Sequence, residues 1–198
     1  MSGAPEAGNP HGVFVGQIVP RDQYHFERLR LVASLVPRGL VVHCPQWSLR
    51  TRARFLAAAL ADPQLAREWR GALRLAVARR EAKFGLEMYR ALAAANVTLN
   101  VHADSSPTHA SNMRLFEATG VGSCLLTDWK ENLHELFEIG REVESYRSRE
   151  ECIDKFAWLL RHPDVARQIG LRGQQRCLRD HAIERRALRL VSLLRSCL

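Results

Sequence analysis

The chain has 198 residues, 46% of them hydrophobic, and a formal net charge of +8 at pH 7. This length and apolar content indicate a folded domain of ordinary size and exclude a disordered chain. No apolar run approaches the roughly 18–20 residues that cross a bilayer, so the sequence predicts no transmembrane segment. Residues 1–12 contain neither the basic stretch nor the apolar core of a signal peptide, and we expect a short disordered lead there.

The positive charge comes almost entirely from arginine, since the only lysines are Lys83, Lys130 and Lys155. The arginines are spread over several expected helices and alternate with Glu and Asp, unlike the basic arm of a nucleic-acid-binding protein. We therefore expect no nucleic-acid partner, although a basic α/β nucleic-acid binder remains the alternative from another class.

Cysteine usage indicates a reducing compartment. The five cysteines are odd in number, and no pair has the C-x-x-C spacing of metal ligands. We expect reduced, buried thiols and a cytoplasmic protein. The cysteines are Cys44, Cys124, Cys152, Cys177 and Cys197.

The first part of the chain predicts a β-α-β unit. Residues 12–16 and 40–44 are short apolar runs of the kind found in buried parallel strands. Between them, apolar residues recur at helical spacing over residues 23–37, which favours a parallel sheet with a right-handed crossover. Residues 50–82 are rich in Ala, Leu and Arg without a strand signal, and they predict a helical insertion of two helices divided at Pro63.

Strand and helix patterns alternate again after this insertion. A polar loop over residues 102–109 separates a β-branched strand from the next helix, and Ser148 with Glu151 forms a capping-box pattern before the tail. The sequence predicts one Rossmann-like, doubly wound α/β domain over residues 13–198 with a helical C-terminal tail. The expected strands are 97–101, 123–127 and 142–146, and the expected helices are 86–95, 111–119, 133–137, 149–160, 165–181 and 183–194.

Polar residues follow the expected strands at one edge of this sheet. In open parallel sheets, ligands bind beyond the carboxyl ends of the strands. Gly16 and His102 follow two strands, and a helix beginning near Ser111 would direct its first amides to the same edge. Arg114 would add a guanidinium that suits phosphate oxygens, and Glu117, three residues later, could accept ribose hydroxyls.

Each of these residues also has a purely structural interpretation. Gly16 could serve only a tight turn, and His102 could be an ordinary loop residue. Arg114 and Glu117 could form a plain surface ion pair at helical spacing. Taken alone, the spacing indicates only a nucleotide-like ligand.

Two motifs resemble those of a known family. NMRLFEATGVG (residues 112–122) followed by LLTD (residues 125–128) resembles the C-terminal domain of GT-B glycosyltransferases, of the CgeB-like or "glycosyl transferases group 1" type. Similarity extends upstream to FGLEMY and VTLN and downstream to RGQQR (residues 172–176), so it covers roughly residue 13 to the C-terminus.

This resemblance implies a domain that binds a nucleotide-diphosphate sugar donor. Glu117 matches the second glutamate of the E-x7-E pattern of retaining members, which binds the donor ribose, whereas the first glutamate falls on His109. The resemblance therefore does not predict whether transfer retains or inverts configuration. No D-x-D motif is present, and we expect neither a metal nor another cofactor. The implied donor-binding residues are Gly16, His102, Asn112, Met113, Arg114 and Glu117.

A GT-B enzyme also has an N-terminal domain that contributes the acceptor site. Because the first expected strand begins near Val13, we expect that domain, or a separate subunit in its place, to lie outside this sequence. The leading interpretation is the donor-binding half of a glycosyltransferase. The alternatives are a non-catalytic nucleotide-sugar-binding module or partner subunit, and half of a sugar-nucleotide epimerase of GT-B-like fold.

Overall fold

The computed structural model describes residues 11–18, 26–50, 53, 57, 71, 74–102 and 107–196. Most of the predicted helical insertion at 50–82 lies outside these ranges. The predicted lead of residues 1–12 also lies outside them, except for its last two residues, and Gly12 already belongs to the first strand.

Five parallel strands form the central sheet, in the order β2-β1-β3-β4-β5. The strands are short and mostly buried, which explains why they read as continuous apolar runs. β5 begins two residues later than the sequence predicts. The strands are β1 (Gly12–Val15), β2 (Leu40–His43), β3 (Val97–Asn100), β4 (Cys124–Asp128) and β5 (Glu144–Tyr146).

Arg80 extends the sheet beyond β2, although the sequence predicts no strand in residues 50–82. It pairs with His43 in a single parallel bridge, in which its N–H donates to the Val42 carbonyl over 2.7 Å. A one-residue bridge needs no alternating apolar pattern, so the Ala- and Arg-rich sequence gives no sign of it.

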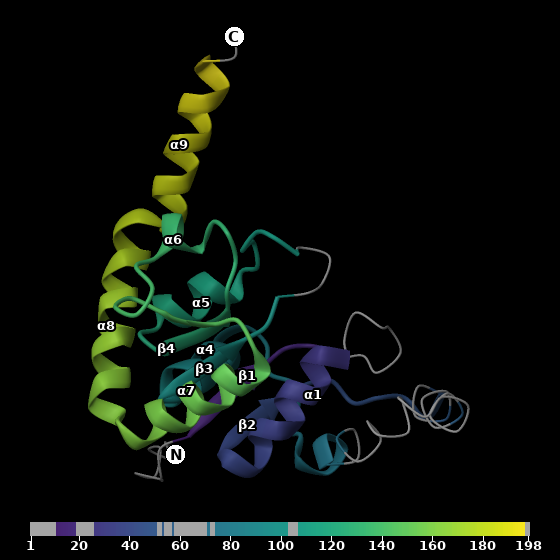
Figure 1. The fold of residues 1–198 in the computed structure, drawn as a ribbon. Helices are drawn as coiled ribbons and strands as arrows, with labels where there is room; N and C mark the ends of the chain where they lie inside the picture. The colour runs from purple at the N-terminus through teal and green to yellow at the C-terminus, as the bar shows by residue number, and fades with distance from the viewer. Residues whose placement is uncertain are drawn as a thin grey trace, which may run out of the picture.

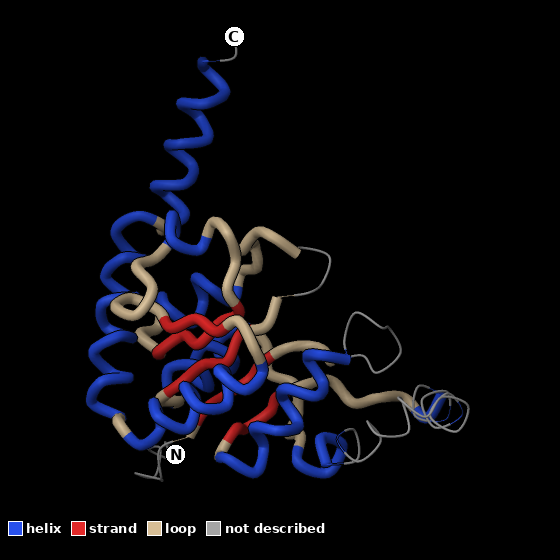
Figure 2. The backbone as a smooth tube through the Cα atoms, in the orientation of Figure 1, coloured by secondary structure: helices blue, strands red, loops and turns tan. Residues whose placement is uncertain are grey.

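Helices cover both faces of the sheet (Figures 1 and 2). α1 and α7 pack on one face, whereas α4, α5 and α8 pack on the other. Gly170 on α8 lies so close to the carbonyl oxygen of Gly122 that a Cβ there would clash with it. The helices are α1 (Phe26–Leu35), the 3-10 helix η2 (Val36–Arg38), α4 (Gly85–Ala94), α5 (Arg114–Gly120), α6 (Leu133–Leu136), α7 (Arg149–Arg161), α8 (Pro163–Asp180) and α9 (Ile183–Ser196).

The capping-box pattern before α7 is confirmed at its first residue. The Ser148 hydroxyl accepts a hydrogen bond from the N–H of Glu151 over 3.1 Å. The Glu151 carboxylate bonds back to the N–H of Arg147 over 2.7 Å, one residue before the cap.

α5 begins three residues later than predicted. The sequence predicts a helix over 111–119, but the first helical residue is Arg114, after the turn residue Met113. Just before this stretch, the N–H of Ala110 donates to the side-chain oxygen of Asn132 over 2.6 Å. With only seven residues, α5 lacks the expected first turn at Ser111.

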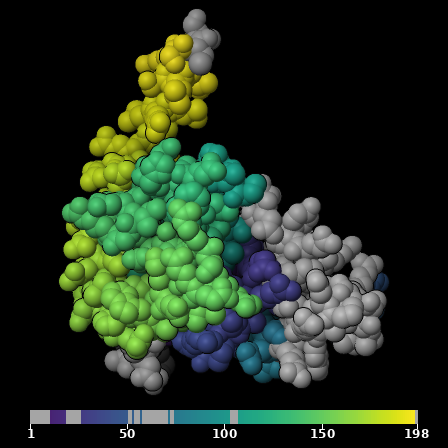
Figure 3. Space-filling view, in the orientation of Figure 1, coloured from purple at the N-terminus to yellow at the C-terminus, as the bar shows by residue number. Residues whose placement is uncertain are grey.

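α9 projects from the body of the protein (Figure 3). No described side chain of α9 is buried, and near its beginning the Arg186 guanidinium lies 4.0 Å from the centroid of the Phe116 ring. The remaining apolar side chains of α9 are exposed, including those of Leu190 and Leu194, each 58% exposed. None of the described helices is long and apolar enough to span a membrane.

Candidate functional site

The order of the strands places a switch point between β1 and β3. The chain runs from β1 outward to β2, and then returns to the other side of β1 to form β3, β4 and β5. Loops leaving β1 and β3 therefore diverge at this point, at the carboxyl edge of the sheet, where doubly wound folds bind ligands. Gly16 and His102, both predicted as site residues, follow these two strands.

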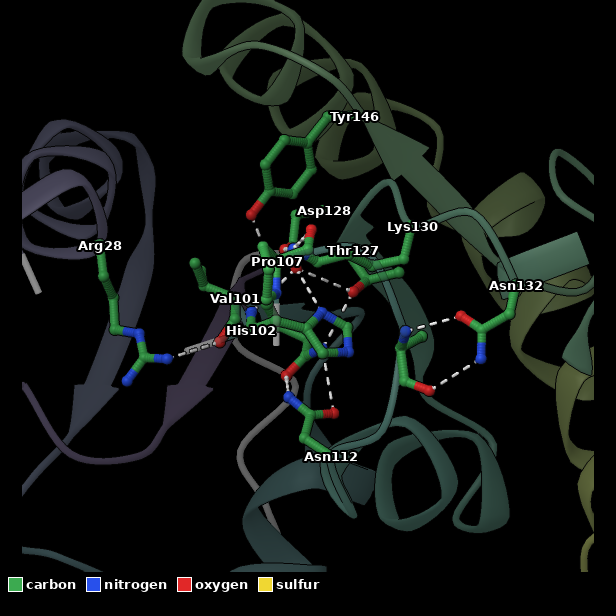
Figure 4. A network of polar contacts seen from close by, with 12 residues as sticks. Arg28, Val101, His102, Pro107, Asn112, Thr127, Asp128, Lys130, Asn132 and Tyr146 are labelled. Carbon is green, nitrogen blue, oxygen red and sulfur yellow. Dashed lines mark hydrogen bonds and ion pairs between the residues drawn. The ribbon is translucent and has the colours of Figure 1, made fainter. Parts of the chain in front are cut away.

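Arg28 from α1 connects the two loops across the switch point (Figure 4). Its guanidinium donates to the Gln17 carbonyl over 3.1 Å and to the Val101 carbonyl over 2.9 Å. A planar, multiply donating guanidinium can hold two carbonyls at a fixed separation. Arg28 thus fixes the relative position of the backbone segments that carry Gly16 and His102.

The buried His102 pairs with the half-buried Asp128 at the ends of β3 and β4. The Asp128 carboxylate accepts hydrogen bonds from the His102 backbone N–H over 2.9 Å and from His102 Nδ1 over 2.7 Å. The His102 side chain is only 1% exposed. Because a carboxylate only accepts, Nδ1 carries the hydrogen, and Nε2 has no hydrogen-bond partner in the described ranges.

The surroundings of Asp128 keep it ionised. Burial alone would raise the pKa of Asp128, but the hydrogen bonds and charge of His102 outweigh burial, and the Lys130 ammonium 3.3 Å away adds to them, so the pKa lies below its ordinary value. Lys130 also donates to the Pro107 carbonyl over 2.9 Å. The loop after β3 is thereby tied to β4.

A second set of polar contacts joins β3, β4 and the segment before α5. Asn100 and Asn112 exchange side-chain hydrogen bonds of 3.3 and 2.8 Å, and Asn100 also donates to the Thr127 hydroxyl over 2.9 Å. The hydroxyl of Tyr146 donates to the Asn100 carbonyl over 3.1 Å. Asn112, a predicted site residue, therefore anchors the start of α5 to the edge of the sheet.

Arg114 and Glu117 lie together in the first turn of α5, as their spacing predicts. The guanidinium and the carboxylate are 2.7 Å apart, and their side chains are 17% and 16% exposed. Arg114 also lies 2.9 Å from the Met88 sulfur on α4. Burial lowers the pKa of Arg114, and the negative charge of Glu117 opposes this effect.

A pocket of about 480 Å³ lies beside this pair. α4, α5, α8 and the start of α9 form its walls, and Glu117 contributes a carboxylate. Aromatic side chains are prominent: Phe116 contacts the His181 ring at a centroid distance of 5.0 Å. Tyr89, Met113 and Arg186 also line this pocket.

The structure divides the predicted site residues into two groups. His102 and Asn112 belong to the polar network at the strand ends, whereas Met113, Arg114 and Glu117 lie at the start of α5 beside the pocket. Met113 is 73% exposed. Gly16 follows β1, and its N–H donates to the His43 carbonyl over 3.1 Å.

Several residues of this site escape sequence reasoning. Asn100 is a polar residue at the end of an apolar strand, and this signal could have identified it. Arg28 carries no such signal, because its contacts depend on how α1 crosses the sheet. Tyr146 resembles an ordinary core aromatic until its hydroxyl is placed.

The sheet order, the switch point and the polar edge together define a doubly wound, Rossmann-like α/β protein. A family model described as "Glycosyl transferase-like" matches residues 28–192. The chain belongs to this glycosyl transferase-like family, and the match confirms the resemblance to GT-B glycosyltransferases that the motifs predict. The CgeB-like subtype stays a prediction. A search of curated proteins gives no match.

Solved structures share the fold at low sequence identity. The chain resembles sucrose-phosphate synthase from Thermosynechococcus elongatus (17% identity, TM-score 0.65, 96% of this chain and 45% of that one). It also resembles Anabaena HepE, solved in complex with UDP-glucose (13% identity, TM-score 0.64, 97% and 50%). A third neighbour is the C-terminal domain of a group 1 glycosyl transferase, LpcC, from Francisella tularensis (11%, TM-score 0.57, 88% and 89%). The chain thus spans about half the length of the first two proteins and most of the third.

Proposed function

We propose that this chain binds a nucleoside-diphosphate sugar and serves as the donor-binding half of a glycosyltransferase. The observation that carries the proposal is the half-buried Arg114–Glu117 pair at the start of α5, beside the 480 Å³ pocket, in a chain of the glycosyl transferase-like family. HepE, which shares the fold, is a protein solved with UDP and with UDP-glucose, and this supports the same class of ligand here.

The chemistry of the pair suits such a donor. Glu117 offers carboxylate oxygens to ribose hydroxyls, while the guanidinium of Arg114 offers several N–H donors to phosphate oxygens. In the structure the Arg114 guanidinium and the Glu117 carboxylate form an ion pair with each other. Binding would therefore replace part of this ion pair with contacts to the ligand. The aromatic side chains of Tyr89 and Phe116 in the pocket wall could stack on the base of the nucleotide.

In transfer, the donor loses a nucleoside diphosphate, and negative charge develops on the leaving group. Arg114 is the side chain of this site that would stabilise that charge electrostatically. The acceptor and its activating base would come from a second α/β half.

α9 supports the involvement of a second half. Its exposed apolar side chains lie on a helix that projects from the body of the protein. The structural match to HepE covers 97% of this chain, and the unmatched residues are too few to contain α9. The same match covers only 50% of HepE. We expect the second half, in the same longer protein or as a separate subunit, to cover this helix.

Calorimetry with UDP-glucose, GDP-mannose and ADP-glucose tests donor binding. We expect one of them to bind and to raise the melting temperature. Arg114→Gln and Glu117→Gln should each weaken that binding about tenfold or more, because each removes a charge-assisted hydrogen bond.

The matched control is the pair Arg141 and Glu138, which has the same i, i+3 spacing but is 63% and 58% exposed. Arg141→Gln and Glu138→Gln should leave donor affinity unchanged. The proposal fails if no nucleotide sugar binds, or if the α5 variants bind as tightly as the wild type while remaining folded.

A further inference from the structure

A second pocket, of about 390 Å³, lies between α4 and the strands β1 and β2. Its lining includes apolar side chains from both sides: Val13 and Val41 come from the strands, and Ala91 and Ala94 from α4. Val13 and Val41 are register partners, so they form one continuous surface. An organic molecule could rest on this apolar surface.

The charged groups of this pocket are predominantly positive. Arg80, Lys83 and Arg90 line it, and Glu87 is the only acid among its described lining residues. Among the residues that the structure describes, none forms a hydrogen bond or an ion pair with the side chains of these three cations. Arg114, in contrast, is paired with a carboxylate. Unpaired cations around a concave surface concentrate positive potential there.

His43 experiences this potential. It lies at the end of β2, is 6% exposed, and its Nδ1 donates to the Glu81 carbonyl over 2.9 Å. Burial lowers its pKa, and although the Glu81 hydrogen bond opposes this, the charges of Lys83 and Arg80 lower the pKa further. A bound anion would offset those charges and raise the pKa of His43, so this pKa reports whether the pocket holds an anion.

This pocket is separate from the donor-site residues. Glu87, Arg90 and Ala91 face it from one side of α4. Met88, which contacts Arg114, and Tyr89, which lines the other pocket, lie on the side of α4 that faces α5. A ligand here would be held apart from Glu117 by the width of a helix.

We propose that the pocket between α4 and the β1–β2 face binds the phosphate group of an organic phosphate ester, with Arg80, Lys83 and Arg90 as its cationic contacts. Guanidinium groups match phosphate oxygens with paired donors, and the lysine ammonium adds a compact positive charge. The body of the ester lies against the apolar side chains of Val41, Ala91 and Ala94. This site does not depend on donor binding.

Proton NMR titration of the histidine ring signals tests the proposal, with the His43 signal assigned from a His43→Gln variant. The probes are phenyl phosphate and, separately, phosphatidylcholine vesicles with and without phosphatidic acid. We expect a phosphate probe to raise the pKa of His43. A response to phenyl phosphate assigns a soluble ester, and a response only to phosphatidic acid assigns a lipid headgroup.

Variants locate the binding. Arg80→Gln and Arg90→Gln should weaken probe affinity about tenfold each. Arg172→Gln, an equal charge change at an exposed position on α8, and Arg114→Gln at the donor site should not. The proposal is overturned if the pKa of His43 stays constant at the highest concentration of both probes. It is also overturned if Arg114→Gln weakens binding as much as Arg90→Gln does, because the phosphate then occupies the donor site.

Discussion

Replacing Asp128 with alanine tests whether the His102–Asp128 pair stabilises the edge of the sheet where donor binding is proposed. The substitution removes the acceptor of two hydrogen bonds, from the His102 N–H and from Nδ1. The His102 side chain is 1% exposed, so water cannot readily replace the carboxylate. Each unsatisfied buried donor costs roughly 1–3 kcal/mol, so we expect Asp128→Ala to lower the free energy of unfolding by about 2–6 kcal/mol.

Asp128→Asn separates charge from hydrogen bonding. Its side-chain oxygen can still accept both bonds from His102, so the expected loss is smaller, about 1–2 kcal/mol near pH 7. The folded-state pKa of Asp128 lies below its ordinary value. The carboxylate therefore contributes stability that is complete above the unfolded-state pKa of about 4 and is lost as pH falls through the lower folded-state value. The difference between wild type and Asp128→Asn should shrink below about pH 4.

Urea denaturation followed by far-UV circular dichroism measures both effects. The control is Asp180→Asn, because Asp180 has exposed partners at the end of α8 and should change stability little. Equal urea midpoints for the wild type and Asp128→Ala would refute the reasoning. So would a difference between wild type and Asp128→Asn that grows as the solution is acidified.

Four further variants or probes test other parts of the structure. Arg28→Ala should weaken nucleotide-sugar binding in calorimetry, because it releases the loops after β1 and β3; unchanged affinity would show that this link is not needed. Gly170→Ala should cost about 1–3 kcal/mol in urea denaturation, because α8 lies against the Gly122 carbonyl, whereas Gly120→Ala, with ordinary contacts, should be tolerated. Burial raises the pKa of Cys124 to about 12, so its alkylation by iodoacetamide, mapped by mass spectrometry, should be far slower in the native protein than in urea. Leu190→Asp on α9 should change the free energy of unfolding by less than about 0.5 kcal/mol, since that side chain is exposed; a larger loss would mean that α9 packs on the domain in solution.

The sheet could be predicted from the sequence because each strand is short, apolar and buried. Four of the predicted strands agree with the structure to within one residue at each end, and the fifth, β5, begins later. The start of α5 and the bridge at Arg80 could not be predicted. Both depend on contacts made by distant residues: Asn132 with the backbone of Ala110, and Arg80 with β2. The local sequence pattern of a segment does not show which distant residues it will contact.

The candidate site shows the same division. Arg114 and Glu117 are predicted as neighbours because helical spacing alone places them on one face, and the structure confirms the pair. The helix expected from Ser111 begins at Arg114, so its first amides lie three residues later than the sequence predicts, and the anion site itself stays a prediction. His102 is predicted only as a loop residue near the ligand. Its pairing with Asp128 requires the parallel register of β3 and β4, which no single segment reveals.

The polar network at the strand ends and the Arg114–Glu117 pair differ in what they can contribute to a ligand. His102 is buried, its Nδ1 and backbone N–H both donate to Asp128, and only its Nε2 lacks a partner among the described residues, so the main effect of this pair is to hold the ends of β3 and β4 together. Arg114 and Glu117 are partly exposed and border a pocket. Variants of Asp128 should therefore lower stability and donor affinity together, whereas variants of Glu117 should lower donor affinity with a smaller effect on stability. If Glu117→Gln destabilised the protein as much as Asp128→Ala while leaving binding intact, the pair on α5 would be a structural ion pair, and the donor site would have to lie elsewhere on the edge.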